Sequence, residues 1–510
     1  MAVVSGGFKA MVESWMHALV NYSIRAKIIE PRDQTYFLNR LYAFFHISLP
    51  CINITDIPCE SLEKILSELL REANDSNLNY EHKNREDDTI KDEIMNLFAK
   101  KPSDIERDFW DYYFINPQKA TNWFYHYCCS INYVKKERSD CNLSWLYQSK
   151  KRVGSLELTI NLAKPEKDPQ TIALNSTRAE KTYPLCQLCK ENEGNIGVES
   201  SGSRANLRTI TLLLNNEKWY MQFSPYQYYQ EHIIVFSENH IPMNVNEMTI
   251  RRLLDFVDLF PQYFIGSNAG LPIVGGSILN HDHFQGGLKT FPIENAPIID
   301  RIQKDEISIS ILEWPLTAIR VESTNREAIY NCAKLIMTEW KNYNNDIQNI
   351  VAFSDGAVHN ATAPIVRKRN NIYQLYLILR NNRTDKDHPL GIFHPHSDVH
   401  HIKKENIGLI EAMGMAILPG RLLRELDIVE KYLNGGTLEP KDIEAFQIHK
   451  EWANMIHSKH ASENIYYSKE LIFEEVAAVF EKGLEDCAVF QQHKNGVSDL
   501  ICWIQTILHV

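Results

Sequence analysis

A short glycine-flanked segment, residues 275–287, contains the side chains whose types and spacing are best suited to chemistry. It carries His281, His283 and Gln285 at alternate positions, with a pair of glycines on each side. Alternate residues of a β-strand face the same side, so a strand here would present these three side chains as one polar row. Paired glycines let backbone N–H groups approach a bound anion closely, which suits a phosphate.

An imidazole in this row is suited to attack on phosphorus. Its ordinary pKa is about 6.5, so near neutral pH it is largely unprotonated and nucleophilic without a separate base. A covalent intermediate divides one difficult displacement into two easier ones, provided that a neighbouring group fixes the tautomer. The Gln285 amide can donate a hydrogen bond to a phosphoryl oxygen. A surface pair or a metal site would also contain His-x-His, but the glycines and the glutamine favour a phosphate site.

A second cluster of basic side chains lies further along the chain. Five histidines fall between residues 388 and 401, and two arginines and two lysines flank them: His388, His394, His396, His400, His401, Arg380, Arg383, Lys403 and Lys404. A local basic patch in an acidic protein suits a phosphorylated ligand. The alternative is a solvated loop whose charges cap helices.

Two cysteines, Cys186 and Cys189, have the Cys-x-x-Cys spacing of a zinc-binding hairpin. A tetrahedral site needs two further ligands. The alternative is a pair of reduced thiols at a tight turn.

Apolar periodicity indicates the elements that must position these residues. Helical spacing predominates from about residue 8 to residue 130, a strand is expected over 154–161, and two prolines in 164–169 predict a linker. Two strand-then-helix blocks follow. Strands are expected over 209–214, 218–223, 232–236, 273–279, 363–367 and 373–379, and helices over 246–260, 326–343 and 406–417.

The two blocks predict an α/β fold built from a duplicated unit and preceded by a helical N-terminal segment. The expected regions are a mainly helical one over 1–180, a first unit with the catalytic motif over 181–325, and a second unit with C-terminal helices over 326–510. A chain of 510 residues is long enough for several domains.

Composition narrows the class of partner. The net charge of −11 argues against nucleic acid, which demands a dominant basic surface. No apolar run reaches the roughly 18 to 20 residues that span a bilayer, and Lys9 and Glu13 interrupt the N-terminal apolar stretch. The ten cysteines are therefore expected to be reduced thiols in a cytoplasmic protein. No glycine fingerprint of a nicotinamide or flavin enzyme opens a helix after a strand, so we expect no organic cofactor.

The motifs also resemble those of a known family. They are the row itself, His281-Asp-His283-Phe-Gln285, and the flanking segments 183–194, 216–220, 224–226, 275–279, 379–384, 388–396, 399–408 and 418–421. Together they resemble the galactose-1-phosphate uridylyltransferases of the second, mainly bacterial class. The row itself resembles the histidine-triad motif in its transferase form, in which glutamine replaces the third histidine. The implied fold is a pair of histidine-triad-like units with an antiparallel sheet and flanking helices.

The resemblance implies a reaction and roles for its residues. The family transfers UMP from UDP-glucose to galactose 1-phosphate by a ping-pong mechanism through a covalent UMP–histidine intermediate. By motif position His283 is the nucleophile, Gln285 the donor to phosphate, and His281 a supporting residue. Substrate contacts are expected from Asn268, Ser277, Arg380, Arg383, His394, His396 and Lys403. The implied partners are a UDP-hexose and a hexose 1-phosphate, and a homodimer is possible.

The resemblance also completes the metal set and shows one departure. In first-class relatives two histidines join the Cys-x-x-Cys pair, and the matching positions here are His240 and His281. The implied site is a structural zinc held by these histidines with Cys186 and Cys189. The departure is Leu207, which stands where the family pattern has a histidine and which leaves the substrate role of the loop 203–208 open.

Three other classes of protein remain as alternatives. A nucleotide phosphorylase or hydrolase of the histidine-triad superfamily is disfavoured by Gln285, because an amide cannot shuttle a proton as a third histidine can. A catalytically silent zinc-binding or interaction protein would not need the intact row. An oxidoreductase is disfavoured because the sequence lacks the glycine fingerprint of a nicotinamide or flavin enzyme.

Overall fold

The computed structural model describes residues 2–51, 54–162, 183–197, 203–461, 465–491 and 495–509. The predicted linker over 164–169 and the boundary predicted between residues 180 and 181 lie outside the described residues. The domain boundaries of the sequence analysis therefore stay predictions.

A ten-stranded sheet forms the centre of the molecule, in the order β3-β4-β5-β7-β6-β13-β14-β10-β9-β8. Every neighbouring pair in it is antiparallel. The strands are β3 (Ile210–Leu214), β4 (Glu217–Phe223), β5 (Ile233–Ser237), β6 (Phe264–Gly266), β7 (His283–Gly287), β8 (Ile298–Lys304), β9 (Ile307–Leu312), β10 (Ala318–Ser323), β13 (Asn360–Arg369) and β14 (Ile372–Asn381).

The strand order shows the duplication directly. One half reads β3-β4-β5-β7-β6 and the other, from the opposite edge, β8-β9-β10-β14-β13, so the two halves have the same topology and meet where β6 pairs with β13. Helix α9 (Glu247–Leu259) stands between β5 and β6, and α10 (Arg326–Asn342) between β10 and β13. The predicted antiparallel, duplicated α+β fold is confirmed. The predicted boundary at 325/326 falls between β10 and α10.

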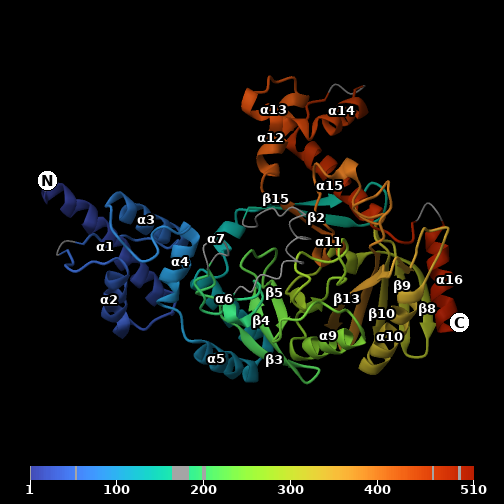
Figure 1. The fold of residues 1–510 in the computed structure, drawn as a ribbon, viewed down its shortest axis with the longest axis horizontal. Coiled ribbons are helices and arrows are strands. Elements are labelled where there is room, and N and C mark those ends of the chain that lie inside the picture. Colours follow the sequence, from blue (N-terminus) through green and yellow to red (C-terminus); the bar gives the residue numbers. More distant parts are fainter. Residues whose placement is uncertain are drawn as a thin grey trace.

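Helices α9 and α10 cover one face of this sheet (Figure 1). Helix α9 begins with a capping box, because the Asn246 side chain accepts from Met248 N at 2.8 Å and Thr249 Oγ1 accepts from Asn246 N at 3.2 Å. Its apolar face then packs on the sheet through Ile250, Leu253 and buried neighbours. Both helices thus cover the strands with the apolar face that their amphipathic pattern predicted.

A smaller sheet lies over the opposite face of the large one. It has the order β1-β2-β15, with β1 (Leu143–Gln148) antiparallel and β15 (Met415–Pro419) parallel to β2 (Ser155–Asn161). Buried side chains of β2 and β15 share a core with residues of the large sheet such as Phe264 and Ile378. This small sheet covers the strands that carry the predicted site residues.

Two predicted elements are wrong. The segment 273–279 is a loop, not a strand, and Ile273 has a φ of 72°; the glycines that follow it favour turns over a ladder. The helix expected over 406–417 is only the short α11 (Leu409–Ala412), after which the chain enters β15. A short apolar run does not distinguish a buried strand from a buried helix by periodicity.

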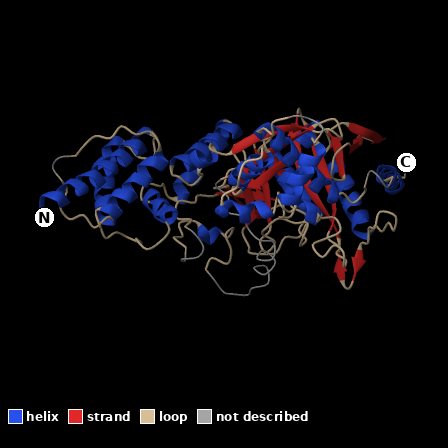
Figure 2. Cartoon of the chain, turned by 90° about the horizontal axis from the view of Figure 1, so that it is seen from above, coloured by secondary structure: helices blue, strands red, loops and turns tan. Residues whose placement is uncertain are grey.

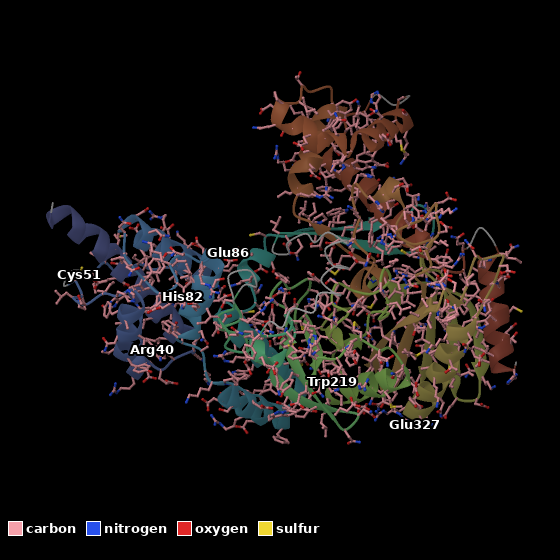
Figure 3. All side chains as sticks on the ribbon, in the orientation of Figure 1. Arg40, Cys51, His82, Glu86, Trp219 and Glu327 are labelled. Carbon is pink, nitrogen blue, oxygen red and sulfur yellow. The ribbon has the colours of Figure 1, made fainter. Side chains whose placement is uncertain are left out.

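The predicted helical N-terminal region is confirmed over its described residues. Its helices are α1 (Ala2–Arg25), α2 (Gln34–Phe44), α3 (Leu62–Asp75), α4 (Asp87–Asn96), α5 (Pro102–Ile115), α6 (Pro117–Ser130) and α7 (Lys136–Ser139), with the 3-10 turn η1 (Pro31–Asp33). They lie beside the sheet and extend the molecule to one side (Figures 1 and 2). Figure 3 labels Arg40, His82 and Glu86 in this region and Trp219 on the sheet.

The C-terminal region consists of helices: α12 (Leu422–Leu433), α13 (Pro440–Gln447), α14 (Lys450–Lys459), α15 (Lys469–Asp486) and α16 (Gly496–Leu508). The remaining short elements lie earlier in the chain: η2 (Lys190–Asn192), η3 (Pro292–Asn295), β11 (Phe353–Ser354), β12 (Ala357–Val358) and η4 (Ser397–Val399). Helices α12 to α14 project from the body as an arm (Figure 1). Among the described residues, no helix is both long and apolar enough to cross a membrane.

Candidate active site

His283 opens strand β7, between β5 and β6, and its side chain is buried. Its Nδ1 lies 2.8 Å from the carbonyl oxygen of His281. A carbonyl can only accept, so Nδ1 carries the proton and Nε2 keeps the lone pair. Burial lowers the pKa of His283 to about 4, which keeps the ring neutral near pH 7. The tautomer that a nucleophilic imidazole needs is therefore selected by the backbone two residues away.

A pocket lies beside His283, under the small sheet. Its lining includes three other residues named from the sequence, Gln285, Asn268 and Ser277. The pocket therefore brings together four of the predicted site residues. On the other face of β7, Phe284 stacks on Trp219 with ring centroids 4.7 Å apart, which anchors the strand against the helical layer.

The glycines before the motif hold the loop of Ser277 tightly against Asn268. A Cβ added to Gly276 would lie 2.6 Å from Asn268 Nδ2, and one added to Gly275 would lie 2.6 Å from the carbonyl oxygen of Leu271. Only glycine allows such an approach. Asn268 is fixed from its other side, because its Oδ1 accepts from Leu409 N at 2.9 Å. The glycines thus permit close packing of the loop within the protein, while the predicted approach of their N–H groups to a phosphate stays a prediction.

His281 does not belong to the expected polar row. Strand β7 begins only at His283, and the ring of His281 lies against two cysteines, with Nδ1 3.2 Å from Cys186 Sγ and 3.7 Å from Cys189 Sγ. Two members of the row, His283 and Gln285, line the pocket. The alternation rule fails here because the segment before His283 is not extended in the sheet.

A cluster of four metal-ligating side chains forms beside the pocket: Cys186, Cys189, His240 and His281. Their ligand atoms all lie within 4.8 Å of one another, with Cys186 Sγ 3.5 Å from Cys189 Sγ and His240 Nδ1 3.3 Å from Cys189 Sγ. Zinc bonds of about 2.0 to 2.3 Å in a tetrahedron separate ligand atoms by about 3.3 to 3.8 Å. The predicted set is thus assembled at a spacing that could hold a metal ion.

The surroundings of this cluster also suit a metal. His281 Nε2 donates to the carbonyl oxygen of Ser237 at 2.9 Å, which leaves the lone pair on Nδ1. The hydrogen bond from Cys186, together with those from His281 and His240, lowers the pKa of the Cys189 thiol. A thiolate and a correctly oriented imidazole are what a cation needs.

The predicted basic cluster after residue 380 is not an open patch. Arg380, His394 and Lys403 are buried. Arg380 Nη1 donates to the carbonyl oxygen of Ile407 at 2.9 Å, and His394 Nε2 lies 3.1 Å from Asn406 Oδ1. These side chains lie behind the wall of the pocket and do not line it.

Lys403 has carboxylate partners in the same wall. Its Nζ lies 2.5 Å from a Glu411 oxygen and 3.2 Å from a Glu405 oxygen, and both carboxylates line the pocket. The other two predicted residues lie elsewhere: Arg383 donates to the carbonyl oxygen of Asn349 at 2.8 Å, and His396 lies 3.5 Å from an Asp486 carboxylate oxygen.

Several lining residues were missed by the sequence reasoning. They are Arg204, Gln222, Tyr226, Tyr228, His232, Glu405, Asn406 and Glu411. Arg204 is the sole cation among the described lining residues and lies in the 203–208 loop, whose role the sequence left open. That loop is held by the helical region, since Asn206 Nδ2 donates to the carbonyl oxygen of Ile131 at 2.9 Å. The loop motif was visible in the sequence, but its position beside His283 was not.

The fold and this site define a class of protein. Two units of the same strand order share one sheet, and His283 and Gln285 lie on β7, which is the fourth strand of the first unit counted across the sheet. The matching strand of the second unit, β14, carries no histidine. The molecule is thus a duplicated α+β protein in which, among the described strands, only β7 carries a His-x-Gln motif.

Comparison with known proteins identifies the family. Residues 52–242 match the N-terminal domain, and residues 256–454 the C-terminal domain, of galactose-1-phosphate uridyl transferase. The chain is 39% identical to the galactose-1-phosphate uridylyltransferase of Clostridium acetobutylicum, over 96% of this chain and 98% of that protein. The Streptococcus salivarius enzyme of the same name is 38% identical, over 98% and 99%. The chain belongs to the galactose-1-phosphate uridylyltransferase family.

A solved structure, that of yeast Ap4A phosphorylase, aligns with 73% of this chain and 97% of its own. Its TM-score is 0.37 and its sequence identity 9%.

Proposed function

We propose that the protein transfers UMP from UDP-glucose to galactose 1-phosphate, giving UDP-galactose and glucose 1-phosphate. The observation that carries the proposal is the hydrogen bond from His283 Nδ1 to the His281 carbonyl, in a protein of this family. It leaves a neutral Nε2 with its lone pair in a residue that lines the pocket.

The two half-reactions balance as displacements at one phosphorus. His283 Nε2 attacks the α-phosphorus of UDP-glucose, an N–P bond forms, and the P–O bond to the β-phosphate breaks to release glucose 1-phosphate. A phosphate oxygen of galactose 1-phosphate then attacks the same phosphorus, and the N–P bond breaks to restore the imidazole. The incoming phosphate is already an anion and needs no base.

The other pocket residues stabilise charge during these steps. Gln285 donates to a phosphoryl oxygen of the UMP group. Arg204 binds the phosphate of the sugar phosphate, because a guanidinium matches that geometry with paired donors. Asn268 and Ser277 contact the phosphates from the glycine loop. Lys403, with Arg380 and His394, supports the wall that Glu405 and Glu411 form, and Arg383 and His396 are assigned no direct contact.

The four-residue cluster is proposed to hold a structural zinc ion. The support is the ligand spacing, the lowered pKa of the Cys189 thiol, and the Ser237 carbonyl behind His281. The ion would take no part in the bond changes. It would fix His281, whose carbonyl oxygen in turn orients His283.

Location and assembly complete the proposal. No disulfide joins any of the ten cysteines, which favours a reducing cytoplasm. The arm formed by α12 to α14 exposes Leu423, Ile443 and Met455, which offers an apolar surface for a homodimer. Sedimentation of the purified protein tests the dimer.

One experiment separates transfer from the phosphorylase or hydrolase alternative. Purified protein is incubated with UDP-glucose and no acceptor, and intact mass is measured. We expect a covalently bound UMP that disappears when galactose 1-phosphate is added, with UDP-galactose as product. Rapid release of free UMP without acceptor would favour hydrolysis, and absence of any adduct or product would overturn the proposal.

A further inference from the structure

A second buried imidazole, His232, lies in the same pocket and has no part in the steps above. It directly precedes β5 and lines the pocket with 3% of its surface exposed. Its ring is held between two tyrosine rings, with centroid distances of 4.9 Å to Tyr228 and 4.7 Å to Tyr229. The ring orientation is therefore set by packing.

Neither ring nitrogen of His232 has a hydrogen-bond partner among the described residues, and both are closed off from the pocket volume. Buried polar groups in native proteins are nearly always paired, and an exception calls for a physical explanation. Burial lowers the pKa of His232 to about 3, and the neighbouring Gln285 amide opposes that shift. The ring is neutral near pH 7, with one N–H donor and one acceptor.

The strand register explains why His232 and Gln285 are neighbours. Strand β5 pairs with β7 so that Ile234 lies opposite Gln285 and Ile233 opposite Gly286. One step further along this register brings His232 opposite Gly287, on the face that carries Gln285. Diagonal neighbours on one face are within reach of long side chains.

Gly287 allows the close approach of the Glu231 backbone and of Tyr229, which lie beside His232. Its φ is +141°, and a Cβ there would lie 2.2 Å from the carbonyl oxygen of Glu231 and 3.0 Å from Tyr229. A side chain at this position is therefore excluded. The polar side chain that acts on the His232 ring, by opposing the fall in its pKa, is the Gln285 amide.

We propose that His232 is a positioning residue for Gln285: its ring N–H donates to Gln285 Oε1 and so turns the Nε2 amide group toward the phosphoryl oxygen on His283. The orientation matters because the two ends of an amide have nearly the same shape but opposite polarity. A flipped amide would present its oxygen to an anion. The inference rests on the proposed function, since it assigns the group that orients the amide during UMP transfer.

Direct contact of His232 with substrate is the competing role. Both ring nitrogens of His232 are buried, and its ring packs against Tyr228 and Tyr229, which argues against direct contact with substrate. The two roles differ in kinetics. A residue that acts through Gln285 affects charge stabilisation in the transition state and hence kcat, whereas a binding contact affects KM.

A double-mutant cycle tests the proposal on the full chain. The variants are His232→Phe, which keeps an aromatic ring between the tyrosines, Gln285→Ala, and the two combined. We expect His232→Phe to lower kcat of transfer about tenfold with KM for UDP-glucose changed less than about twofold. We also expect the combined variant to be no slower than Gln285→Ala alone, because the ring acts only through the amide. Multiplicative losses, or wild-type kcat in His232→Phe, would overturn it.

A near-isosteric pair at the same position removes the effect of packing. Asn supplies an N–H donor and Leu does not, while Leu is better suited to the apolar space between the tyrosines. A positioning role predicts a higher kcat for His232→Asn than for His232→Leu, and a merely structural role predicts the reverse. Wild-type protein that forms no UMP adduct would contradict the proposed function itself, whereas a normal wild-type adduct without coupling in the cycle would contradict only this inference.

Discussion

The proposed nucleophile, His283, would derive its reactivity from a local arrangement. The carbonyl oxygen that fixes its tautomer belongs to His281, two residues earlier, and burial in the sheet keeps the ring neutral. A nucleophile of this kind needs no separate base. What it does need is a stable carbonyl, and the hydrogen bond from His281 Nε2 to the carbonyl oxygen of Ser237 helps to fix that residue.

Replacing the nucleophile is the most direct test at this scale. We expect His283→Ala to lower transfer by about 10⁴ or more, since covalent catalysis has no substitute for the missing group. The fold should persist, which circular dichroism and thermal unfolding measure. His82→Ala, in the turn between α3 and α4 (Figure 3), is a matched control that should transfer normally. Near-wild-type turnover in His283→Ala would refute the assignment.

In the proposed mechanism, Gln285 decides what happens to the UMP group once it is bound to His283. Water needs a general base, which is typically worth about 10² to 10⁴ in rate, and an amide cannot act as one. We expect Gln285→His to lower transfer and raise release of free UMP, because the new imidazole accepts a proton. Both products are quantified from UDP-glucose with and without galactose 1-phosphate. A loss of transfer with an unchanged ratio of hydrolysis to transfer would show that Gln285 serves only as a hydrogen-bond donor.

At the scale of elements, the site is built where a loop, two strands and the small sheet meet. Strands β5 and β7 carry Gln285 and its neighbours, the loop before β7 carries Ser277, and the segment after Lys403 closes the opposite wall. The loop keeps its shape through close backbone packing, so its glycines are as important as its polar residues.

Gly276→Ala tests that packing. The added Cβ would lie 2.6 Å from Asn268 Nδ2, so Asn268 or the loop must move. A displacement of this size beside the reacting phosphorus is expected to lower kcat/KM for UDP-glucose roughly tenfold or more. Gly420→Ala is the control, because its nearest neighbour would lie at 3.5 Å. Equal kinetics of the two variants would show that the loop tolerates displacement.

At the scale of the whole molecule, the Cys-x-x-Cys hairpin, the segment after β5 and the loop before β7 meet in one cluster. A metal ion there would tie these distant segments together and contribute directly to folding. The helical N-terminal region has a comparable task, because Asn206 holds the Arg204 loop against Ile131. Distant parts of the chain thus hold the two sides of the pocket.

Measurements of metal content and stability test whether a metal ion ties these segments of the chain together. We expect protein purified without added metal to contain nearly one equivalent of zinc by elemental analysis. Cys186→Ser should lose the metal and unfold at a lower temperature, while the relative rates with different sugar phosphates stay unchanged. Cys332→Ser, at a buried thiol outside the cluster, controls for loss of a thiol. Activity that survives strong chelation in metal-free protein would remove zinc from the proposal without affecting His283.

Local patterns in the sequence were sufficient for the elements and for the chemical groups. Helical periodicity predicted α9 and α10, strand patterns predicted β3, β4, β5, β13 and β14 of the large sheet, and residue spacing picked out His283, Gln285 and the Cys-x-x-Cys pair, because these signals act over a few residues. Longer-range packing decided the rest. It turned His281 away from the pocket toward Cys186, converted the end of the expected 406–417 helix into β15 beside β2, and buried Lys403 behind Glu411. It also brought Arg204 and His232 to the nucleophile, since proximity between residues far apart in the chain depends on strand order and register, which no local pattern records.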